Sequence, residues 1–396
     1  MNKYLSLVSA PRTIELADKV RTLEREGNKI IKFQTGDPNF QTHIDIVTAL
    51  NESISRGETH YTNSQGLLEL REAISNIKQE TYRVSVEPNK EIIVTSGAAQ
   101  GIYLSLAALL NPFDEVILFE PYYPQYEYII KFLGGSVKTI PAFFNSFSHV
   151  FEIDFDIFQE MLSEKTKILI INSPNNPSGK IYSREEIERI IEISKKRNIY
   201  ILADEVYCHI VDKSKKHVSF LEYPEIFERL IYINSFSKTY AMTGWRLGYI
   251  ISHKEIIDQI VKLLRLNTTC VQTFIQRAGI VALQSSNVRQ YVNRMIDKYN
   301  ERRISIYNSI KHHPMFGTYP DGAFYYLLRL PDFTPKGIDL WAQKLLEKEL
   351  VAVVPAYVYG NSVNNFIRIS FSIDDQLVTE GLNRLINFYN LSNRKV

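Results

Sequence analysis

The chain has 396 residues, 45% of them hydrophobic, and a formal net charge of +2 at neutral pH. This length and hydrophobic content allow a large core and predict two domains, whereas the small net charge argues against a nucleic-acid-binding protein. Only two cysteines, Cys208 and Cys270, are present, which excludes a disulfide framework and fits a reducing compartment.

The N-terminal segment carries no recognisable targeting signal. Met1–Val8 lacks a signal-length apolar run ahead of Pro11, and no apolar stretch reaches the roughly 18 residues that a membrane helix needs. We therefore expect a cytoplasmic protein with no membrane partner.

Short apolar runs rich in β-forming residues alternate with longer amphipathic segments along the chain. This alternation predicts an α/β fold with a largely parallel sheet. Open α/β sheets bind ligands beyond the carboxyl ends of their strands, so polar residues that follow these strands are candidate site residues. The predicted strands are 91–95, 115–119, 167–171, 200–203, 230–233 and 247–251.

The strand predicted over 91–95 runs into a turn of small residues, Ser96–Gly101, and then into an apolar helix predicted over 102–110. Small residues let backbone amides approach an anion, and the positive end of the helix favours that anion. A phosphate could therefore bind here. An ordinary strand-to-helix turn is the alternative for this segment taken alone.

An aromatic cluster, Glu120–Tyr126, follows the strand that ends at Phe119. An aromatic face laid against a flat ligand ring would fix the plane of that ring and exclude water. Core packing is the alternative for any one of these tyrosines.

The segment Asn172–Gly179 contains two prolines and a glycine, which favour a rigid turn. Such a turn can aim the side chain of Asn176 with little conformational freedom left to lose, although a plain β-turn is the alternative. Ser183 and Glu186 then form a capping-box pattern, so we expect Ser183 to begin a helix and to be structural.

Asp204 ends the apolar run 200–203, where an unpaired carboxylate would be costly to bury. A cationic ring nitrogen of a ligand would satisfy this carboxylate. A carboxylate that caps the following helix is the alternative.

The most informative segment is Ser235–Tyr249, which places Lys238 among hydroxyl residues and follows it with Arg246. A free lysine amine has a pKa near 10.4, so its deprotonation at neutral pH costs roughly 4 to 5 kcal/mol. An imine with an aldehyde cofactor avoids that cost. Ser235, Ser237 and Arg246 carry the groups that grip a phosphate. We therefore interpret Lys238 as the Schiff-base lysine of a pyridoxal phosphate enzyme.

Arg368 lies in Asn365–Phe371, a segment with alternating β-like character. Its guanidinium could point into a cleft and clamp a carboxylate through paired hydrogen bonds. A surface strand arginine is the alternative for Arg368, as a polar loop is for the Lys238 segment taken alone.

The Ser-x-Ser-Lys segment, with its Gly-x-Arg-x-Gly-Tyr continuation at Gly244–Tyr249, closely resembles the lysine motif of class I and II aminotransferases. These are fold type I pyridoxal phosphate enzymes of the aspartate aminotransferase superfamily. The other segments resemble the family in the same order, from about residue 10 to about residue 390.

This resemblance implies a fold and a division into domains. The expected fold is a large domain with a mainly parallel sheet of the seven-stranded type, flanked by helices, plus a smaller α/β domain. The implied parts are 1–44 as an N-terminal arm and part of the small domain, 45–281 as the large cofactor-binding domain, and 282–396 as the small C-terminal domain.

The resemblance also implies roles at the cofactor, pyridoxal 5′-phosphate. The backbone amides of Ala98 and Ala99 cup its phosphate, together with Ser235, Ser237 and Arg246. Further expected contacts are Tyr123 stacked on the ring, Asn176 and Tyr207 donating to the phenolic oxygen, Asp204 at the ring nitrogen and Lys238 in the Schiff base. Donors at the phenolic oxygen favour its anionic form and so lower the pKa of the imine.

For the substrate, the resemblance implies Arg368 at the α-carboxylate, with Gly36 and Asn176 beside it. Tyr61 is expected to cross the interface of a homodimer and reach the phosphate of the neighbouring subunit. Asp37 departs from the family pattern, and Ala356 stands where the family often has glycine, so no role is transferred to either position.

We therefore expect an aminotransferase that moves the amino group of an L-amino acid to a 2-oxo acid by a ping-pong mechanism. The alternatives are a pyridoxal phosphate lyase, for example one that catalyses β-elimination, and a non-catalytic cofactor-binding regulator. No residue can be assigned to a second substrate carboxylate, so the identity of the amino acid stays open.

Overall fold

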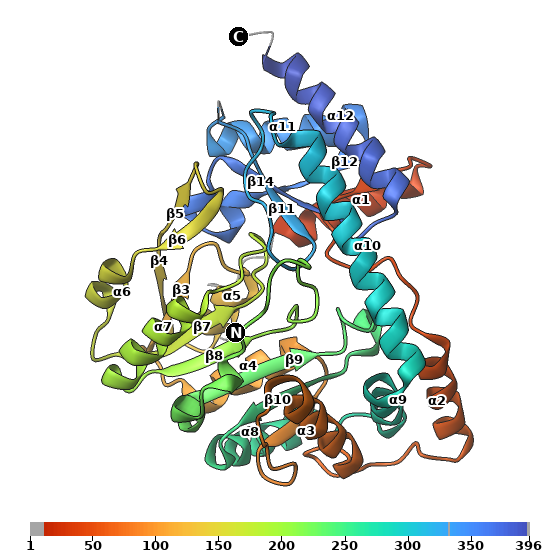
Figure 1. Ribbon diagram of the computed structural model, residues 1–396, viewed down its shortest axis with the longest axis vertical. Helices are drawn as coiled ribbons and strands as arrows, with labels where there is room; N and C mark the ends of the chain where they lie inside the picture. The colour runs from red at the N-terminus through yellow and green to blue at the C-terminus, as the bar shows by residue number, and fades with distance from the viewer. Residues whose placement is uncertain (1–11, 332, 394–396) are drawn as a thin grey trace, which may run out of the picture.

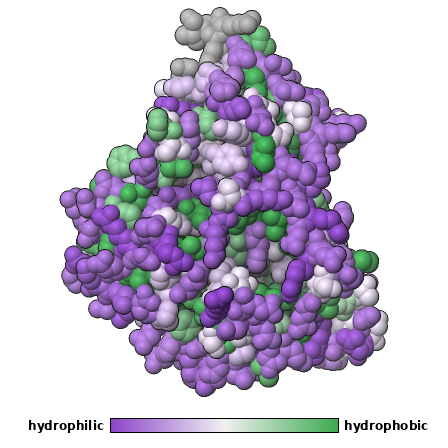
Figure 2. All heavy atoms as spheres, viewed as in Figure 1, coloured by the Kyte–Doolittle hydropathy of each residue, from purple (hydrophilic) through white to green (hydrophobic). Residues whose placement is uncertain are grey.

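The structure is a computed structural model that describes residues 12–331 and 333–393 (Figure 1). Met1–Val8, for which the sequence predicts no targeting signal, lies outside the described residues, as do the outermost ends of the predicted parts 1–44 and 282–396. Hydrophilic residues cover most of the face shown in Figure 2, with hydrophobic residues gathered around a hollow near its middle.

The centre of the molecule is a seven-stranded sheet with the order β2-β10-β9-β8-β7-β3-β4. β10 is antiparallel to both of its neighbours, and the remaining neighbours pair in parallel. This confirms the α/β fold with a mainly parallel sheet. The strands are β2 (Ile92–Thr95), β3 (Glu115–Phe119), β4 (Ser136–Ile140), β7 (Thr166–Asn172), β8 (Tyr200–Asp204), β9 (Leu230–Ser235) and β10 (Gly248–Ser252).

Helices cover both faces of this sheet, because successive side chains of a strand point to opposite faces. In β7, Ile168 and Ile170 belong to one core cluster, whereas Leu169 and Ile171 belong to another. The first cluster includes residues of α4 (Ala98–Leu109), α5 (Gln125–Phe132) and α8 (Lys254–Asn267). The second includes residues of α2 (Ile44–Ser55), α3 (Leu68–Tyr82), α6 (Phe155–Met161), α7 (Arg184–Arg197) and α9 (Thr273–Gln284).

The helix predicted to begin at Ser183 is α7, and its N-terminus has the predicted capping box. The Ser183 hydroxyl accepts a hydrogen bond from the backbone N–H of Glu186, and the Glu186 carboxylate accepts one from the backbone N–H of Ser183. Ser183 is therefore structural, as expected.

A smaller body is built from both ends of the chain, shown in red and blue in Figure 1. Its three-stranded antiparallel sheet has the order β11-β14-β13, and a parallel pair, β1-β12, joins the N-terminal segment to the C-terminal third. The strands are β1 (Ile31–Lys32), β11 (Tyr325–Arg329), β12 (Val351–Ala352), β13 (Val354–Pro355) and β14 (Phe366–Ser370). The helices are α1 (Arg12–Arg25), α11 (Pro335–Glu349) and α12 (Asp375–Asn393).

Two elements tie the smaller body to the rest of the molecule. α10 (Ser286–Ile310) packs Val288 and Val292 into the core of the large sheet, and Tyr299 and Ile306 into the core of the small one. The hairpin β5 (Ala142–Asn145) and β6 (Val150–Ile153) packs against residues of β11 and β14. The predicted boundary at residue 281 falls within α9, and the domain boundaries stay a prediction.

In the part of the chain that the structure describes, no helix combines the length and the apolar character needed to cross a membrane.

Candidate active site

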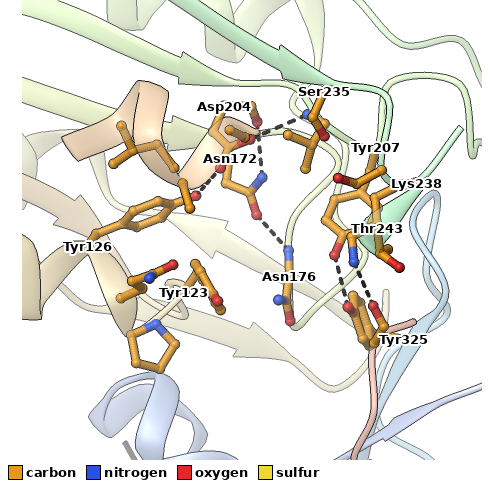
Figure 3. Close-up of a pocket in the computed structure, with 18 of the residues that line it drawn as sticks. Tyr123, Tyr126, Asn172, Asn176, Asp204, Tyr207, Ser235, Lys238, Thr243 and Tyr325 are labelled. Carbon is orange, nitrogen blue, oxygen red and sulfur yellow. Dashed lines mark hydrogen bonds between the residues drawn. The ribbon is translucent and has the colours of Figure 1, made fainter. Parts of the chain in front are cut away.

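A cavity of about 400 Å³ lies where the carboxyl ends of β7, β8 and β9 face the smaller body (Figure 3). All the predicted site residues except Tyr61 line it, including residues from both ends of the chain. The Tyr61 side chain is 84% exposed and does not line the cavity of its own chain. The predicted residues in the lining are Gly36, Ala98, Ala99, Tyr123, Asn176, Asp204, Tyr207, Ser235, Ser237, Lys238, Arg246 and Arg368.

One end of the cavity is formed by the N-terminus of α4, where backbone donors and a guanidinium converge. Gly97 caps α4 with φ at 82° and makes no side-chain capping hydrogen bond, so the first amides of the helix receive no side-chain acceptor from that residue. A Cβ atom on Gly97 would lie 2.6 Å from Arg246 Nη2, so the guanidinium lies directly against this turn. Ser235 and Ser237 line the same cavity. This arrangement suits a phosphate.

A close approach of two backbones makes this geometry possible. A Cβ atom on Gly248, the first residue of β10, would lie 2.8 Å from the backbone nitrogen of Ala98. Glycine therefore allows β10 to pass the start of α4, which in turn holds Arg246 beside the helix N-terminus.

A buried carboxylate lies at the end of β8. Asp204 is 4% exposed, and its Oδ2 accepts a hydrogen bond from the Tyr126 hydroxyl at 2.6 Å. Burial raises the pKa of Asp204 to about 6, although the hydrogen bond from Tyr126 acts in the opposite direction. In the paired strand β7, Asn172 donates to the backbone carbonyl of Asp204 at 3.0 Å. A cationic nitrogen of a ligand ring would compensate this carboxylate.

The Lys238 amine lies within the same cavity and donates a hydrogen bond to the carbonyl oxygen of Gly36 at 2.6 Å. Burial lowers the pKa of Lys238 to about 8, and the carboxylate of Asp37 acts in the opposite direction. A larger fraction of this amine is therefore neutral near physiological pH than for a solvated lysine. Asp37 itself accepts a hydrogen bond from the Thr243 hydroxyl at 2.7 Å, a role that the sequence does not predict.

Arg368 lies in β14 and is 5% exposed. Its Nη1 donates to Asn176 Oδ1 at 3.2 Å, and its Nη2 donates to the Gln34 carbonyl at 2.5 Å. The backbone N–H of Asn176 donates to Asn172 Oδ1 at 2.7 Å, which fixes the turn that carries Asn176. Arg368 and Asn176, two of the three residues predicted at the substrate, are therefore joined directly.

Tyrosines line much of the remaining wall. Tyr207 and Tyr325 place their hydroxyl oxygens 2.9 Å apart, and burial raises the pKa of Tyr207. Tyr123 packs edge-on against Tyr126, with ring centroids 5.6 Å apart, and both face the cavity. The predicted stacking of Tyr123 on a ligand ring stays a prediction.

Sequence reasoning missed several residues of this wall. Tyr126 and Asn172 stand inside segments already singled out, and their places just beyond β3 and at the end of β7 could have indicated them. Tyr325 carries no such signal among 24 tyrosines, whereas Tyr359 stands three residues after Ala356 in a segment that resembles the family. Ala356, where the family often has glycine, begins a short 3-10 helix that ends at Tyr359.

Comparisons with known proteins agree with the motifs. Residues 28–385 match the family model for aminotransferases of class I and II. The chain is 34% identical over 391 residues to the aspartate aminotransferase of Thermotoga maritima, which covers 98% of this chain and 99% of that protein. It is 36% identical over 392 residues to the (5-formylfuran-3-yl)methyl phosphate transaminase of Methanocaldococcus jannaschii, which covers 98% of this chain and 100% of that protein.

Solved structures give the same picture. The crystal structure of the aspartate aminotransferase of Thermotoga maritima superposes with a TM-score of 0.91 at 33% identity, over 98% of this chain and 100% of that chain. The aromatic aminotransferase of Pyrococcus horikoshii superposes with a TM-score of 0.89 at 31% identity, over 99% of this chain and 98% of that chain.

Proposed function

We propose that this chain, which belongs to the class I and II aminotransferases, binds pyridoxal 5′-phosphate at Lys238. We further propose that this transferase moves amino groups in a ping-pong reaction. The amino donor is an L-amino acid and the acceptor is a 2-oxo acid. Nothing in the comparisons favours the lyase alternative. The observation that supports the proposal is one cavity lined by a buried carboxylate, a lysine amine, a helix N-terminus and two arginines.

The residues present fit this cofactor. The first amides of α4, with Arg246, Ser235 and Ser237, would hold the phosphate. Asp204, whose buried carboxylate accepts a hydrogen bond from the Tyr126 hydroxyl, would pair with the ring nitrogen. The remaining contacts would be Asn176 and Tyr207 at the phenolic oxygen and Tyr123 on the ring face.

When bound, pyridoxal phosphate supplies an aldehyde carbon for amines and an electron-withdrawing ring beside the substrate's α-carbon. Arg368 would hold the substrate carboxylate, with Gly36 and Asn176 beside it, and so orient the α-carbon toward Lys238. Lys238 Nζ would take the α-proton as a general base and return it as a general acid. The pKa of Lys238, lowered by burial to about 8, suits both roles near neutral pH.

We also propose that the enzyme is a homodimer in the cytoplasm. An exposed Tyr61 is consistent with the role predicted for it, which is contact with the cofactor phosphate of the neighbouring subunit. The low cysteine count, with Cys208 and Cys270 both free, is consistent with a reducing compartment.

A substitution of the lysine tests the proposed function. Lys238→Ala is expected to keep the fold but to lose the absorbance of the imine and almost all amino transfer, because the lysine amine that lines the cavity is gone. Borohydride reduction of the wild-type holoenzyme, followed by peptide mapping, should label Lys238. Lys138→Ala, which removes a lysine of β4 away from the cavity, is the matched control and should retain both properties.

Labelling of a different lysine, or normal turnover by Lys238→Ala, would contradict the proposal. A second experiment identifies the amino donor. The wild-type holoenzyme is mixed with single amino acids, and the absorbance shows which of them convert the cofactor to its aminated form.

A further inference from the structure

Tyr325 makes three contacts within the site, and neither the sequence motifs nor the mechanism above assigns it a role. It lies in β11 of the smaller body, is 2% exposed, and faces Tyr207, which follows β8 of the large sheet (Figure 3). Their hydroxyl oxygens are 2.9 Å apart. A hydrogen bond between two buried hydroxyls therefore joins the two bodies of the molecule inside the cavity.

Packing on three sides fixes the position of Tyr325. A Cβ atom on Gly36 would lie 2.1 Å from the Tyr325 hydroxyl oxygen, so this hydroxyl packs directly against Gly36. The carbonyl of Gly36 is the group that accepts the hydrogen bond from the Lys238 amine. The Arg368 guanidinium carbon lies 4.5 Å from the centroid of the Tyr325 ring. The ring of Tyr207 meets the ring of Tyr325 edge-on at 5.8 Å. The hydroxyl of Tyr325 therefore has little freedom to leave Tyr207.

The direction of the hydrogen bond follows from counting protons. A tyrosine hydroxyl has one proton to donate. If Tyr207 donates that proton to the phenolic oxygen of the cofactor, the proton shared with Tyr325 must come from Tyr325. A hydroxyl that accepts a hydrogen bond becomes a stronger donor, because hydrogen bonds in a chain polarise one another.

We propose that Tyr325 is a positioning residue that donates to Tyr207 and thereby strengthens the hydrogen bond from Tyr207 to the cofactor's phenolic oxygen. The inference rests on the proposed function, because it assigns a partner to a residue of the same site. It also couples the smaller body to the electronic state of the cofactor, since Tyr325 belongs to the strand next to the one that carries Arg368.

The test is a spectroscopic pH titration of the holoenzyme, with Tyr325→Phe compared with wild type. Weaker donation to the phenolic oxygen disfavours its anionic form, so the pKa of the visible cofactor chromophore should rise. We expect a rise of about 0.5, which is roughly a threefold change in proton affinity. Tyr207→Phe should raise the pKa further, and adding Tyr325→Phe to Tyr207→Phe should change it no more, because the two hydroxyls act in series.

A matched control is Tyr326→Phe, the next residue of the same strand, whose hydroxyl donates to the Arg303 carbonyl at 2.7 Å. It loses a buried hydrogen bond of the same kind but should titrate as wild type. An unchanged titration of Tyr325→Phe, an equal shift in Tyr326→Phe, or a full shift in the Tyr207→Phe background would each overturn the inference.

If Tyr325→Phe does not yield folded protein, Gly36→Ala displaces the Tyr325 hydroxyl sterically, and it should raise the chromophore pKa only when Tyr207 is present. A shift of the same size in the Tyr207→Phe background would overturn the inference. Failure of the proposed function is distinguishable, because the wild-type holoenzyme would then transfer no amino group, or show no chromophore bound to Lys238, whichever way the tyrosine variants titrate.

Discussion

At the scale of single residues, the cavity contains ionisable groups whose neutral forms are favoured by the fold. Burial raises the pKa of Asp204 to about 6 and lowers the pKa of Lys238 to about 8. Each shift means that, in the protein without cofactor, burial disfavours the charged form of the side chain. The Arg368 guanidinium donates hydrogen bonds to Asn176 Oδ1 and to the Gln34 carbonyl in the same cavity. The protein without cofactor therefore keeps Asp204 at a cost in folding stability.

Asp204→Asn should stabilise the cofactor-free protein at pH 7. The pKa of Asp204 in the folded protein is above its unfolded value of 3.8, so the folded state binds more protons between these values and stability falls as pH rises through this window. A pKa raised from 3.8 to about 6 corresponds to roughly 3 kcal/mol, which is the upper limit of the expected gain in unfolding free energy. Thermal unfolding of both proteins across pH measures it, and the difference should vanish below about pH 4.

The same substitution should weaken cofactor binding, because the amide cannot supply the charge that pairs with the ring nitrogen.

The control for the stability prediction is Asp258→Asn, which neutralises an exposed carboxylate of α8 and should change the unfolding free energy by less than about 0.5 kcal/mol. A loss of stability in cofactor-free Asp204→Asn at pH 7 would contradict this prediction.

At the scale of elements, the site depends on how a strand and a helix meet. The sequence predicts a helix over 102–110, whereas α4 begins at Ala98, so the turn before it is shorter than expected. Ala98 and Ala99 favour the helix, and Gly97 adopts the positive φ that ends the preceding turn. The helix N-terminus therefore lies at the level of Arg246 rather than one turn deeper.

Gly97→Ala should lower cofactor affinity, because the added Cβ would displace the Arg246 guanidinium that lies 2.6 Å away. Loss of a charged hydrogen bond costs about 1.5 to 3 kcal/mol, which corresponds to roughly a tenfold to hundredfold weaker Kd. Gly57→Ala is the matched control, since Gly57 also has a positive φ but nothing lies within 4 Å of its Cβ position. Titration of the apoprotein with cofactor compares them, and equal affinities would contradict the prediction.

At the scale of the whole molecule, the cavity lies between two bodies with separate cores. α10 belongs to both cores, and the contacts of Arg368 and Tyr325 bring the smaller body to the edge of the large sheet. Tyr61 is the one predicted site residue that does not line the cavity in the described chain, which fits its predicted role across a dimer interface. A site shared in this way requires two subunits to be complete.

Mixed dimers test this arrangement. Tyr61→Ala and Lys238→Ala should each show low activity alone. Unfolding and refolding the two variants together should restore activity, because a mixed dimer then contains one site with both Lys238 and Tyr61. Activity that does not rise on mixing, or a monomer by analytical ultracentrifugation, would contradict the prediction.

The sequence by itself determined where most strands of the large sheet begin and end, because both faces of these strands are buried. Six of its seven strands are predicted within two residues of their bounds, because strands covered on both sides read as continuous apolar runs. β4 was missed, since it is an edge strand and four of its five residues, Ser136 to Thr139, are exposed or half-buried. The lysine motif was equally readable, because its residues are neighbours in the chain.

Only the tertiary structure decided which distant residues complete the site. Tyr325 comes from a segment far from Lys238, and nothing in its local sequence distinguishes it from a core tyrosine. Gln34 and Tyr359 lie near Gly36 and Ala356, but only the fold shows that they face the same cavity. The packing of the smaller body brings them to the cavity, and the pKa shifts of Lys238 and Asp204 arise from the burial that results. Short-range patterns record strands and turns, whereas burial and long-range contacts exist only once the chain has folded.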